Sequence, residues 1–547
     1  MKLPKGVSAS DFNAAIEEFR RIVGAQWVFS SDEDVALYRD AYSPLWGEPD
    51  ELVASAAVAP ESVEQVQTIV RTAGKYKIPL FAISTGKNLG YGGSAPNLAG
   101  SVIVDLKRMN KVIEVDDKRN FCIVEPGVSY FDLYKHIQQH KLKVMMDIPD
   151  PGWGSPLGNA LDHGVGYTWG EFRDHFGAHC GMEVVLPNGE LMRTGMAAVP
   201  GAKTWGENKY GYGAYVDGLF AQANFGIVTK MGFWMMPEPE HFLACQVSVP
   251  RYRDIVPLVD IVNYLEDQGL IGNPRYTSPL DLMTLMMEPD RVKADQELLD
   301  MFAKPGGTSA EEFEKYARSR GMEYWRVLLN FYGPKETVYA NWAYAKKKLA
   351  DIDGVKFQEI ESYALPLDEA TKQKVHHQVA LGIPNMSIFS IGARSKVVPD
   401  PQDGHIWLGS IISRSGEELI KAHEVFGKAV QDLGITPAIV GPFTAPAYWV
   451  HRTFIFMVPF FVSRSDKARN AKVREQYVKL VEIAAKHGWT EYRTGPAFQD
   501  VVAKTYSFNN NALLRFQTTL KDAIDPDGII APGRGGIWPK RFREGKK

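Results

Sequence analysis

Residues 84–96 read Ser-Thr-Gly-Lys-Asn-Leu-Gly-Tyr-Gly-Gly-Ser-Ala-Pro and follow the apolar run Ile78-Pro79-Leu80-Phe81-Ala82-Ile83. The apolar run predicts a buried strand, and the glycines after it permit backbone turns that a Cβ atom would forbid. Successive N–H groups in such a loop can point at an anion such as a pyrophosphate. The loop alone is equally typical of an ordinary glycine-rich turn, and the phenol of Tyr91 within it needs a separate explanation.

The composition is that of a soluble globular protein. The chain has 547 residues, of which 45% are hydrophobic and 23% charged, and its formal net charge is −3. This balance offers no basic surface for nucleic acid. Cys122, Cys180 and Cys245 lie far apart without metal-site spacing, and their small, odd number is typical of a reducing compartment. We expect no metal and no nucleic-acid partner.

No segment predicts membrane insertion or secretion. The first residues lack an apolar stretch of signal length. The uncharged run 433–450 contains three prolines that would break a spanning helix, and the aromatic run 453–462 is too short to cross a bilayer. We therefore expect a cytoplasmic protein without a membrane partner.

Predicted strands and helices alternate irregularly in the first half of the chain. Residues 53–58, 102–106 and 121–124 have the apolar pattern of strands. Ser62 begins a predicted helix with a capping box, and Asn188-Gly189 turns a predicted hairpin. This mixture predicts an α+β fold rather than a regular βαβ series.

The composition changes twice along the chain. Residues 144–240 are rich in glycine and turns, amphipathic helices and alternating strands follow to about residue 485, and the tail is again rich in glycine and arginine. We predict that residues 1–240 and 491–547 form one domain, with a cap domain of residues 241–490 inserted.

Common catalytic motifs are absent from the sequence. The glycines of 164–170 have the wrong spacing for a dinucleotide fingerprint. The chain also has neither a His-Glu-x-x-His motif nor a Gly-x-Ser-x-Gly motif. A Rossmann dehydrogenase, a zinc protease and a serine hydrolase are therefore not indicated.

The loop at 84–96 is one of a series of motifs that extends along nearly the whole chain. The others are Val124-Glu125-Pro126-Gly127-Val128, Pro149-Asp150, Gly158-Asn159, residues 164–168, 181–189 and 222–230, Glu491-Tyr492-Arg493-Thr494, Asn509-Asn510-Asn511 and residues 525–534. Together they resemble the flavin domain of the vanillyl-alcohol oxidase and para-cresol methylhydroxylase family. The match is weakest from about residue 245 to 400.

The resemblance implies a fold and a reaction. FAD is expected between two α+β subdomains, with a cap domain closing over the isoalloxazine ring, and para-substituted phenols are the expected substrates. Removing a hydride from the benzylic carbon leaves a cation-like centre, which a para phenolate converts to a quinone methide. Because a free phenol has a pKa of about 10, the site must supply cationic and hydroxyl donors to hold the phenolate.

The resemblance assigns the catalytic roles to four residues. Tyr91, Tyr492 and Arg493 are the expected donors to the phenolate. Asp150 takes the family position of the carboxylate near flavin N5. It should act either as a base toward water that adds to the quinone methide or as a balance of charge during hydride transfer. Burial is expected to raise its pKa. The alignment favours Asp150 over its neighbour Asp147.

The same motifs imply contacts with FAD. The pyrophosphate should be held by the loop Ser84, Thr85, Gly86, Lys87, Asn88, Leu89 and Gly90. The flavin ring or the ribityl chain should be lined by Ser155, Asn159, Gly164 and Tyr167. Ile227 should meet the adenine side, and Arg534 should reach flavin N1–C2=O, where negative charge develops on reduction. Trp153 stands where relatives often have glycine, and its indole is expected close to the ring.

The mode of flavin attachment differs among members of the family. The tyrosine of the tyrosyl-linked members falls on Gly392, which excludes that link. His405 matches the histidine of the histidyl-linked members and predicts a covalent histidyl–FAD bond. The residue that assists this histidine in the fungal oxidase falls near Tyr42, and a noncovalent His405 is the alternative.

The expected activity is that of an FAD-dependent oxidase of 4-alkylphenols or 4-hydroxybenzylic alcohols that makes hydrogen peroxide. One alternative is the same half-reaction with a cytochrome or another electron acceptor. A second is a flavin-fold binding protein without turnover, against which the joint presence of Tyr91, Asp150, Tyr492 and Arg493 argues. A homodimer is the family expectation.

Overall fold

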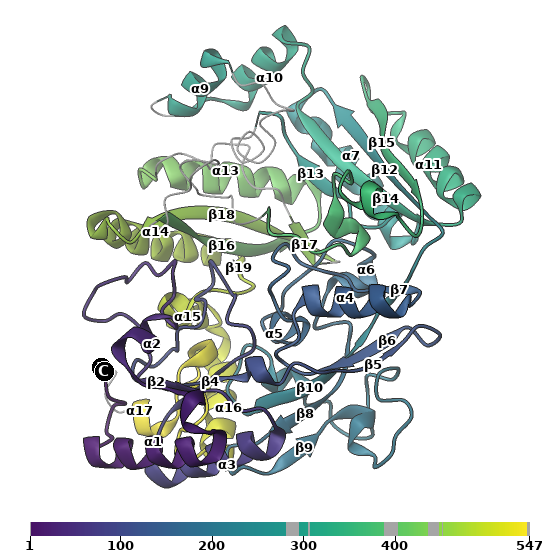
Figure 1. The fold of residues 1–547 in the computed structure, drawn as a ribbon. Helices are drawn as coiled ribbons and strands as arrows, with labels where there is room; N and C mark the ends of the chain where they lie inside the picture. Colours follow the sequence, from purple (N-terminus) through teal and green to yellow (C-terminus); the bar gives the residue numbers. More distant parts are fainter. Residues whose placement is uncertain are drawn as a thin grey trace.

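A computed structural model describes residues 2–280, 295–304, 307–387, 403–435, 448–450 and 452–543. The chain forms a lower part from its two ends and an upper part from its middle (Figure 1). In the lower part the yellow C-terminal helices lie among the purple and blue elements of the N-terminal half (Figure 1). Helices and strands are mixed in both parts, as the predicted α+β class requires.

The first sheet carries the glycine-rich loop. Its strand order is β1-β2-β4-β3, with β2, β4 and β3 parallel and β1 antiparallel. The strands are β1 (Val28–Phe29), β2 (Ala56–Val58), β3 (Leu80–Ile83) and β4 (Val102–Asp105), and the helices beside them are α1 (Ala9–Val23), α2 (Asp32–Ala36) and α3 (Val63–Tyr76). Every predicted strand of this region is present, and Ser62 caps α3 by accepting from Gln65 N.

The second sheet is antiparallel throughout, in the order β5-β6-β10-β8-β9. Its strands are β5 (Val112–Asp116), β6 (Phe121–Val124), β8 (His179–Val185), β9 (Leu191–Arg193) and β10 (Ile227–Trp234); α4 (Tyr130–His140), β7 (Val144–Met145), α5 (Pro156–Leu161), α6 (Gly170–Arg173) and β11 (Met236–Pro237) complete this region. The predicted hairpin is β8–β9, with Gly189 at φ +79° in its turn.

The upper part contains two sheets of four strands each. The first is β13 (Arg275–Thr277), β14 (Trp325–Gly333), β12 (His241–Val249) and β15 (Lys356–Ala364); the second is β17 (Tyr448–Val450), β18 (Thr453–Ser463), β16 (Asp403–Ser413) and β19 (Thr490–Glu491). The helices are α7 (Ile255–Asp267), α9 (Gln296–Ala303), α10 (Ala310–Ser319), α11 (Lys335–Leu349), α12 (Glu369–Lys372), α13 (Gly416–Asp432) and α14 (Lys467–Lys486).

The apolar run near residue 455 is a central strand of this upper part. Nearly all of β18 is buried, and its residues share one hydrophobic core with the strands and helices of both sheets. Among the described helices, none is both long enough and apolar enough to cross a membrane. The hydrophobicity of the run therefore reflects burial in the protein core.

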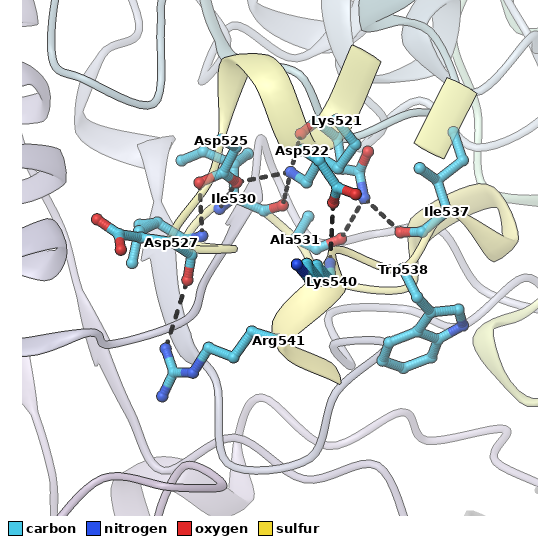
Figure 2. Close-up of polar contacts among 12 residues, drawn as sticks. Lys521, Asp522, Asp525, Asp527, Ile530, Ala531, Ile537, Trp538, Lys540 and Arg541 are labelled. Carbon is cyan, nitrogen blue, oxygen red and sulfur yellow. Dashed lines mark hydrogen bonds and ion pairs between the residues drawn. The ribbon is translucent and has the colours of Figure 1, made fainter. Parts of the chain in front are cut away.

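The C-terminal segment comprises α15 (Gln499–Thr505), α16 (Phe508–Ile524) and α17 (Lys540–Arg543). A fully buried lysine of α16 fixes this segment beside the first sheet. Lys521 Nζ donates to Asp525 Oδ2 at 2.7 Å and to Asn224 O at 2.5 Å. It also donates to Ile530 O at 2.8 Å, so the lysine joins α16 to the turn that follows it (Figure 2).

The same turn extends the first sheet. Ile530 forms a parallel bridge with Leu80, and Leu80 exchanges backbone hydrogen bonds of 2.7 Å with Ile529 O and Ala531 N. The tail of the chain thus lies against β3, the strand that leads into the glycine-rich loop.

Candidate active site

One cavity of about 310 Å³ lies where the two sheets of the lower part meet the second sheet of the upper part. Its walls come from the loop after β3, from α5, from β10, from β16 and β18, and from the turns around Arg493 and Arg534. Sixteen of the eighteen residues expected at the site line it: Ser84, Thr85, Gly86, Lys87, Asn88, Leu89, Tyr91, Asp150, Ser155, Asn159, Tyr167, Ile227, His405, Tyr492, Arg493 and Arg534.

The other two expected residues, Gly90 and Gly164, do not line the cavity but make its walls pack closely. A Cβ on Gly90 would lie 2.8 Å from Trp407 Cδ1, and one on Gly164 would lie 1.3 Å from Asn159 Oδ1. Both positions therefore exclude a side chain. Their expected contacts with FAD stay predictions, and in the described structure they lie against Trp407 and Asn159.

The loop after β3 presents unused backbone donors. Tyr91 N and Gly93 N both donate to Asn88 O, which closes the loop on itself. Within the described chain, no backbone N–H of residues 84–90 donates to another residue. Gly86 has φ +67°, and a Cβ there would lie 2.4 Å from Ser94 Oγ. Free N–H groups on a close-packed, cavity-lining loop fit the pyrophosphate of FAD.

Two phenols and a guanidinium form one end of the cavity. The hydroxyls of Tyr91 and Tyr492 lie 3.1 Å apart, with their rings edge to face. The guanidinium carbon of Arg493 lies 3.8 Å from the Tyr91 ring centroid, and Arg493 Nε is buried without a hydrogen-bond partner among the described residues. This end offers two hydroxyl donors and a cation with spare hydrogen-bonding capacity.

The charges at this end are those that an oxyanion requires. Burial, and then the neighbouring Tyr492, raise the pKa of Tyr91 well above its usual value, so its hydroxyl stays protonated. Burial opposes the charge of Arg493, but the groups around it, among them the carboxylate of Asp162, outweigh burial and raise the pKa of the guanidinium. Neutral hydroxyls beside a permanent cation favour the ionised form of a bound phenol.

Asp150 supplies a carboxyl on the same cavity. It accepts a hydrogen bond from the Tyr167 hydroxyl. Burial raises its pKa, although the Tyr167 bond and Arg275 oppose the shift, and this direction is the one that the sequence predicts. Asp147 instead accepts from Thr168 N and pairs with His175 Nε2, both at 2.7 Å, and it does not line the cavity. The geometry therefore supports the choice of Asp150 over Asp147.

His405 lies in β16 at the cavity wall and is 3% exposed. Its ring centroid is 5.1 Å from that of Tyr42 and 4.8 Å from that of Trp407. Tyr42 thus lies beside the histidine, where the resemblance places the assisting residue. Gly392, the position of the excluded tyrosyl link, lies outside the described residues.

Trp153 does not approach the cavity as expected. Its side chain is 53% exposed, it is absent from the cavity lining, and Lys87 Nζ lies 5.8 Å from its ring centroid. The turn that closes with Gly154 N on Pro151 O leaves the indole on the solvent side of the chain. Trp153 therefore does not contribute to the interior of the described cavity.

Asp162 is the site residue that sequence reasoning missed. Its carboxylate forms an ion pair with Arg534, lies 3.7 Å from Arg493 Nη1, and accepts from Asn88 Nδ2 at 2.7 Å. The residue follows Asn159 in the α5 motif, but an aspartate at the end of a short helix carries no signal of its own. Only the folded chain shows that both expected arginines share one carboxylate.

Glu491 anchors the short strand β19, which leads directly into Tyr492 and Arg493. It accepts from Gly409 N at 2.5 Å and from Ser410 Oγ at 2.9 Å, which ties β19 to β16. Burial raises the pKa of this carboxyl to about 8, against the lowering effect of its hydrogen-bond donors. Gly409 is equally constrained, because a Cβ there would lie 2.9 Å from the Tyr492 ring.

Comparison with known proteins agrees with this site. A family model described as an FAD binding domain matches residues 54–195. The chain is 34% identical to the 4-cresol dehydrogenase (hydroxylating) flavoprotein subunit of Pseudomonas putida, over 98% of this chain and 97% of that protein.

Two solved structures match almost the whole chain. The 4-ethylphenol oxidase of Gulosibacter chungangensis, in complex with isoeugenol, has a TM-score of 0.84 and 33% identity over 99% of this chain and 100% of that one. p-Cresol methylhydroxylase with substrate bound also has a TM-score of 0.84, with 31% identity over 98% of this chain and 99% of that one.

The family model and the loop of free N–H groups define an FAD-binding protein. Within that class, the similarity along the full length identifies the family. The chain belongs to the vanillyl-alcohol oxidase and para-cresol methylhydroxylase family of FAD-dependent phenol oxidoreductases.

Proposed function

We propose that this protein oxidises para-substituted phenols, namely 4-alkylphenols or 4-hydroxybenzylic alcohols, at the benzylic carbon. The observation that carries the proposal is the convergence of Tyr91, Tyr492 and Arg493 on one cavity that also holds Asp150. FAD bound along residues 84–90 supplies the hydride acceptor. The protein's own residues bind the phenol, favour its ionised form and control protons near the benzylic carbon.

The phenol-binding end of the cavity acts on the substrate's charge. Tyr91 and Tyr492 donate hydrogen bonds to the phenolate oxygen, and Arg493 supplies the opposite charge. An ionised phenol pushes electron density toward the para position, where positive charge develops as the hydride leaves. Interactions that strengthen as this charge develops accelerate the reaction.

Asp150 acts at the other end of the substrate. As a carboxylate it removes a proton from water that adds to the quinone methide. Its raised pKa brings its proton affinity closer to neutral pH than that of an exposed aspartate. The Tyr167 hydroxyl holds one of its oxygens and thereby orients the other.

We propose oxygen as the electron acceptor, with hydrogen peroxide as the product. Asp150 and His405, which both line the cavity, support this choice through the family resemblance, and so does the similarity to a protein named as an oxidase. A dehydrogenase that passes electrons to a cytochrome is the alternative, favoured by the name of the Pseudomonas relative.

Rapid mixing distinguishes the two acceptors. The holoprotein is reduced with 4-ethylphenol under anaerobic conditions and then mixed either with oxygen or with cytochrome c. Fast reoxidation by oxygen with stoichiometric peroxide supports the oxidase. Reoxidation by cytochrome alone supports the dehydrogenase. If the phenol does not reduce the flavin, the result supports the remaining alternative, a flavin-fold binding protein without turnover.

We further propose a covalent bond between His405 and FAD. The burial of His405 on the cavity wall, with the Tyr42 ring beside it, supports this bond. Acid precipitation should leave the yellow colour with the protein, and His405→Ala should release it to the supernatant. Colour in the supernatant of the unsubstituted protein would exclude the bond.

The division into residues 1–240, 241–490 and 491–547, the homodimer and the cytoplasmic location stay predictions. Light scattering of the purified holoprotein tests the dimer directly, because a monomer would have the mass of a single 61.0 kDa chain.

A further inference from the structure

Two arginines of the cavity share a single carboxylate. Asp162 Oδ1 pairs with Arg534 Nη2, and Asp162 Oδ2 faces Arg493 Nη1 at 3.7 Å. The three side chains are only 11–15% exposed. Asn88, on the loop after β3, donates to the same Oδ2 at 2.7 Å. Four segments that are distant in sequence therefore meet at one buried charge.

The backbone around Asp162 is held as firmly as its side chain. Asp162 N donates to Asn159 O at 3.1 Å, and Asp162 O accepts from Gln222 Nε2 at 3.3 Å. Gln222 Nε2 also donates to Tyr492 O at 2.9 Å. The backbones of Asp162 and Tyr492 thus share Gln222 as a common partner, which fixes the distance between them.

We propose that Asp162 is a shared counter-ion and a positioning residue: it holds Arg534 in the site by an ion pair, and it reduces the positive charge that Arg493 and Arg534 present to a bound anion. The proposal rests on the proposed function, because the anion at Arg493 is the phenolate. Two guanidiniums and one carboxylate leave one net positive charge. A single phenolate balances that charge, so this cluster of three side chains matches one bound anion.

A counter-ion role predicts that removing the Asp162 charge lowers the pKa of the bound phenol, whereas loss of a merely structural aspartate would weaken the site. A nearby cation lowers the pKa of a bound phenol, and a nearby carboxylate raises it. Asp162→Asn removes the carboxylate charge, so the bound phenol should ionise at a lower pH. Removing one charge near the bound phenol at a partly buried site should lower the pKa of that phenol by about one unit. Below the midpoint of its ionisation, the phenol should then bind about tenfold more tightly.

The shape of the site survives this substitution. Arg493 keeps its stacking on Tyr91, and its contact with Asp162 is too long to be a hydrogen bond. The new amide oxygen can still accept from Arg534, and Asn88 can turn its own amide oxygen toward the new amide nitrogen. The other titratable groups on the cavity are Lys87, Tyr91, Asp150, Tyr167, His405 and Tyr492, and the substitution leaves all of them in place.

The test uses the oxidised holoprotein and 4-nitrophenol, which has no benzylic hydrogen to transfer. Its dissociation constant and its phenolate absorption band are measured between about pH 5 and 9. Asp527→Asn is the matched control, because Asp527 forms an exposed ion pair with Lys77. The proposal expects the midpoint of bound-phenol ionisation to fall by about one unit in Asp162→Asn and not in Asp527→Asn.

An unchanged or raised midpoint in Asp162→Asn, with the phenol still bound, overturns the counter-ion role and leaves the proposed function standing. If the unsubstituted protein binds the phenol only in its neutral form, or does not bind it, both the proposed function and this inference fail. Asp162→Glu provides a second variant that retains the charge. Its midpoint should equal or exceed that of the unsubstituted protein, and a lower midpoint contradicts the proposal.

Discussion

The buried lysine of the C-terminal segment tests how the two ends of the chain build one cofactor site. Lys521 is fully buried and donates to three acceptors, one of which is the equally buried Asp525 (Figure 2). Lys521→Met keeps the apolar stem but removes the ammonium group. Among the described residues, the Asp525 carboxylate then keeps only its bonds from Ile529 N and Ile530 N, both 2.8 Å.

The magnitude follows from the unpaired charge that remains. Breaking a buried ion pair by removing one partner costs about 3–5 kcal/mol. The carbonyl oxygens of Asn224 and Ile530 lose their donor as well, which keeps the estimate in the upper half of that range. The nearby Lys540 uses only its backbone N–H in this network, and its side chain is exposed. Lys540→Met should therefore change stability by less than about 0.5 kcal/mol.

Urea unfolding followed by circular dichroism measures the loss, and flavin absorbance of the purified proteins measures FAD content. Because Ile530 and Ala531 line the cavity, Lys521→Met should lose both stability and FAD. A loss below about 1 kcal/mol, or an FAD content equal to that of Lys540→Met, would refute the view that this pair fixes the cavity wall.

Three further substitutions test separate parts of the site. Arg493→Met should slow flavin reduction by 4-ethylphenol at least about 30-fold, since loss of a buried charged partner costs about 2–5 kcal/mol; stopped-flow rates within threefold of the unsubstituted protein would contradict it. Burial raises the pKa of Asp150, so protonation of this carboxyl should slow turnover of the unsubstituted protein as the pH falls. Asp150→Asn should abolish this dependence, and an unchanged pH profile of turnover would exclude Asp150 as the base. Glu491 has a folded pKa of about 8 against an ordinary value of 4.5, so its protonated form favours folding and this stability is lost as pH rises toward 8. Glu491→Gln should therefore lose less stability than the unsubstituted protein between pH 6 and pH 9 in urea titrations, and equal losses would contradict this assignment.

The sequence predicts the contacts that are local to a motif. The apolar run and the glycines after it are sufficient to predict a strand, a turn and a set of free N–H groups. Tyr91 is interpretable only through the family resemblance, because its partner Tyr492 lies 401 residues away. The structure brings these two hydroxyls to within 3.1 Å of each other.

The sequence does not predict contacts that depend on several distant segments. Asp162 meets Asn88 across 74 residues and Arg534 across 372, and no local pattern marks it as a counter-ion. The orientation of Trp153 depends on a tight turn, so its place in an alignment does not show that it faces solvent. The sequence does not show what a side chain at Gly90 or Gly164 would meet, because the nearest atoms belong to Trp407 and Asn159.

The central claim is that Tyr91, Tyr492 and Arg493 bind an ionised phenol for hydride removal. Anaerobic mixing of the holoprotein with 4-ethylphenol, and separately with its methyl ether 4-ethylanisole, tests it most directly. The two compounds share the benzylic carbon, but only the phenol can ionise. We predict that 4-ethylphenol bleaches the flavin absorbance with a saturating rate while 4-ethylanisole leaves it unchanged. Equal bleaching by both compounds, or by neither, would contradict the claim.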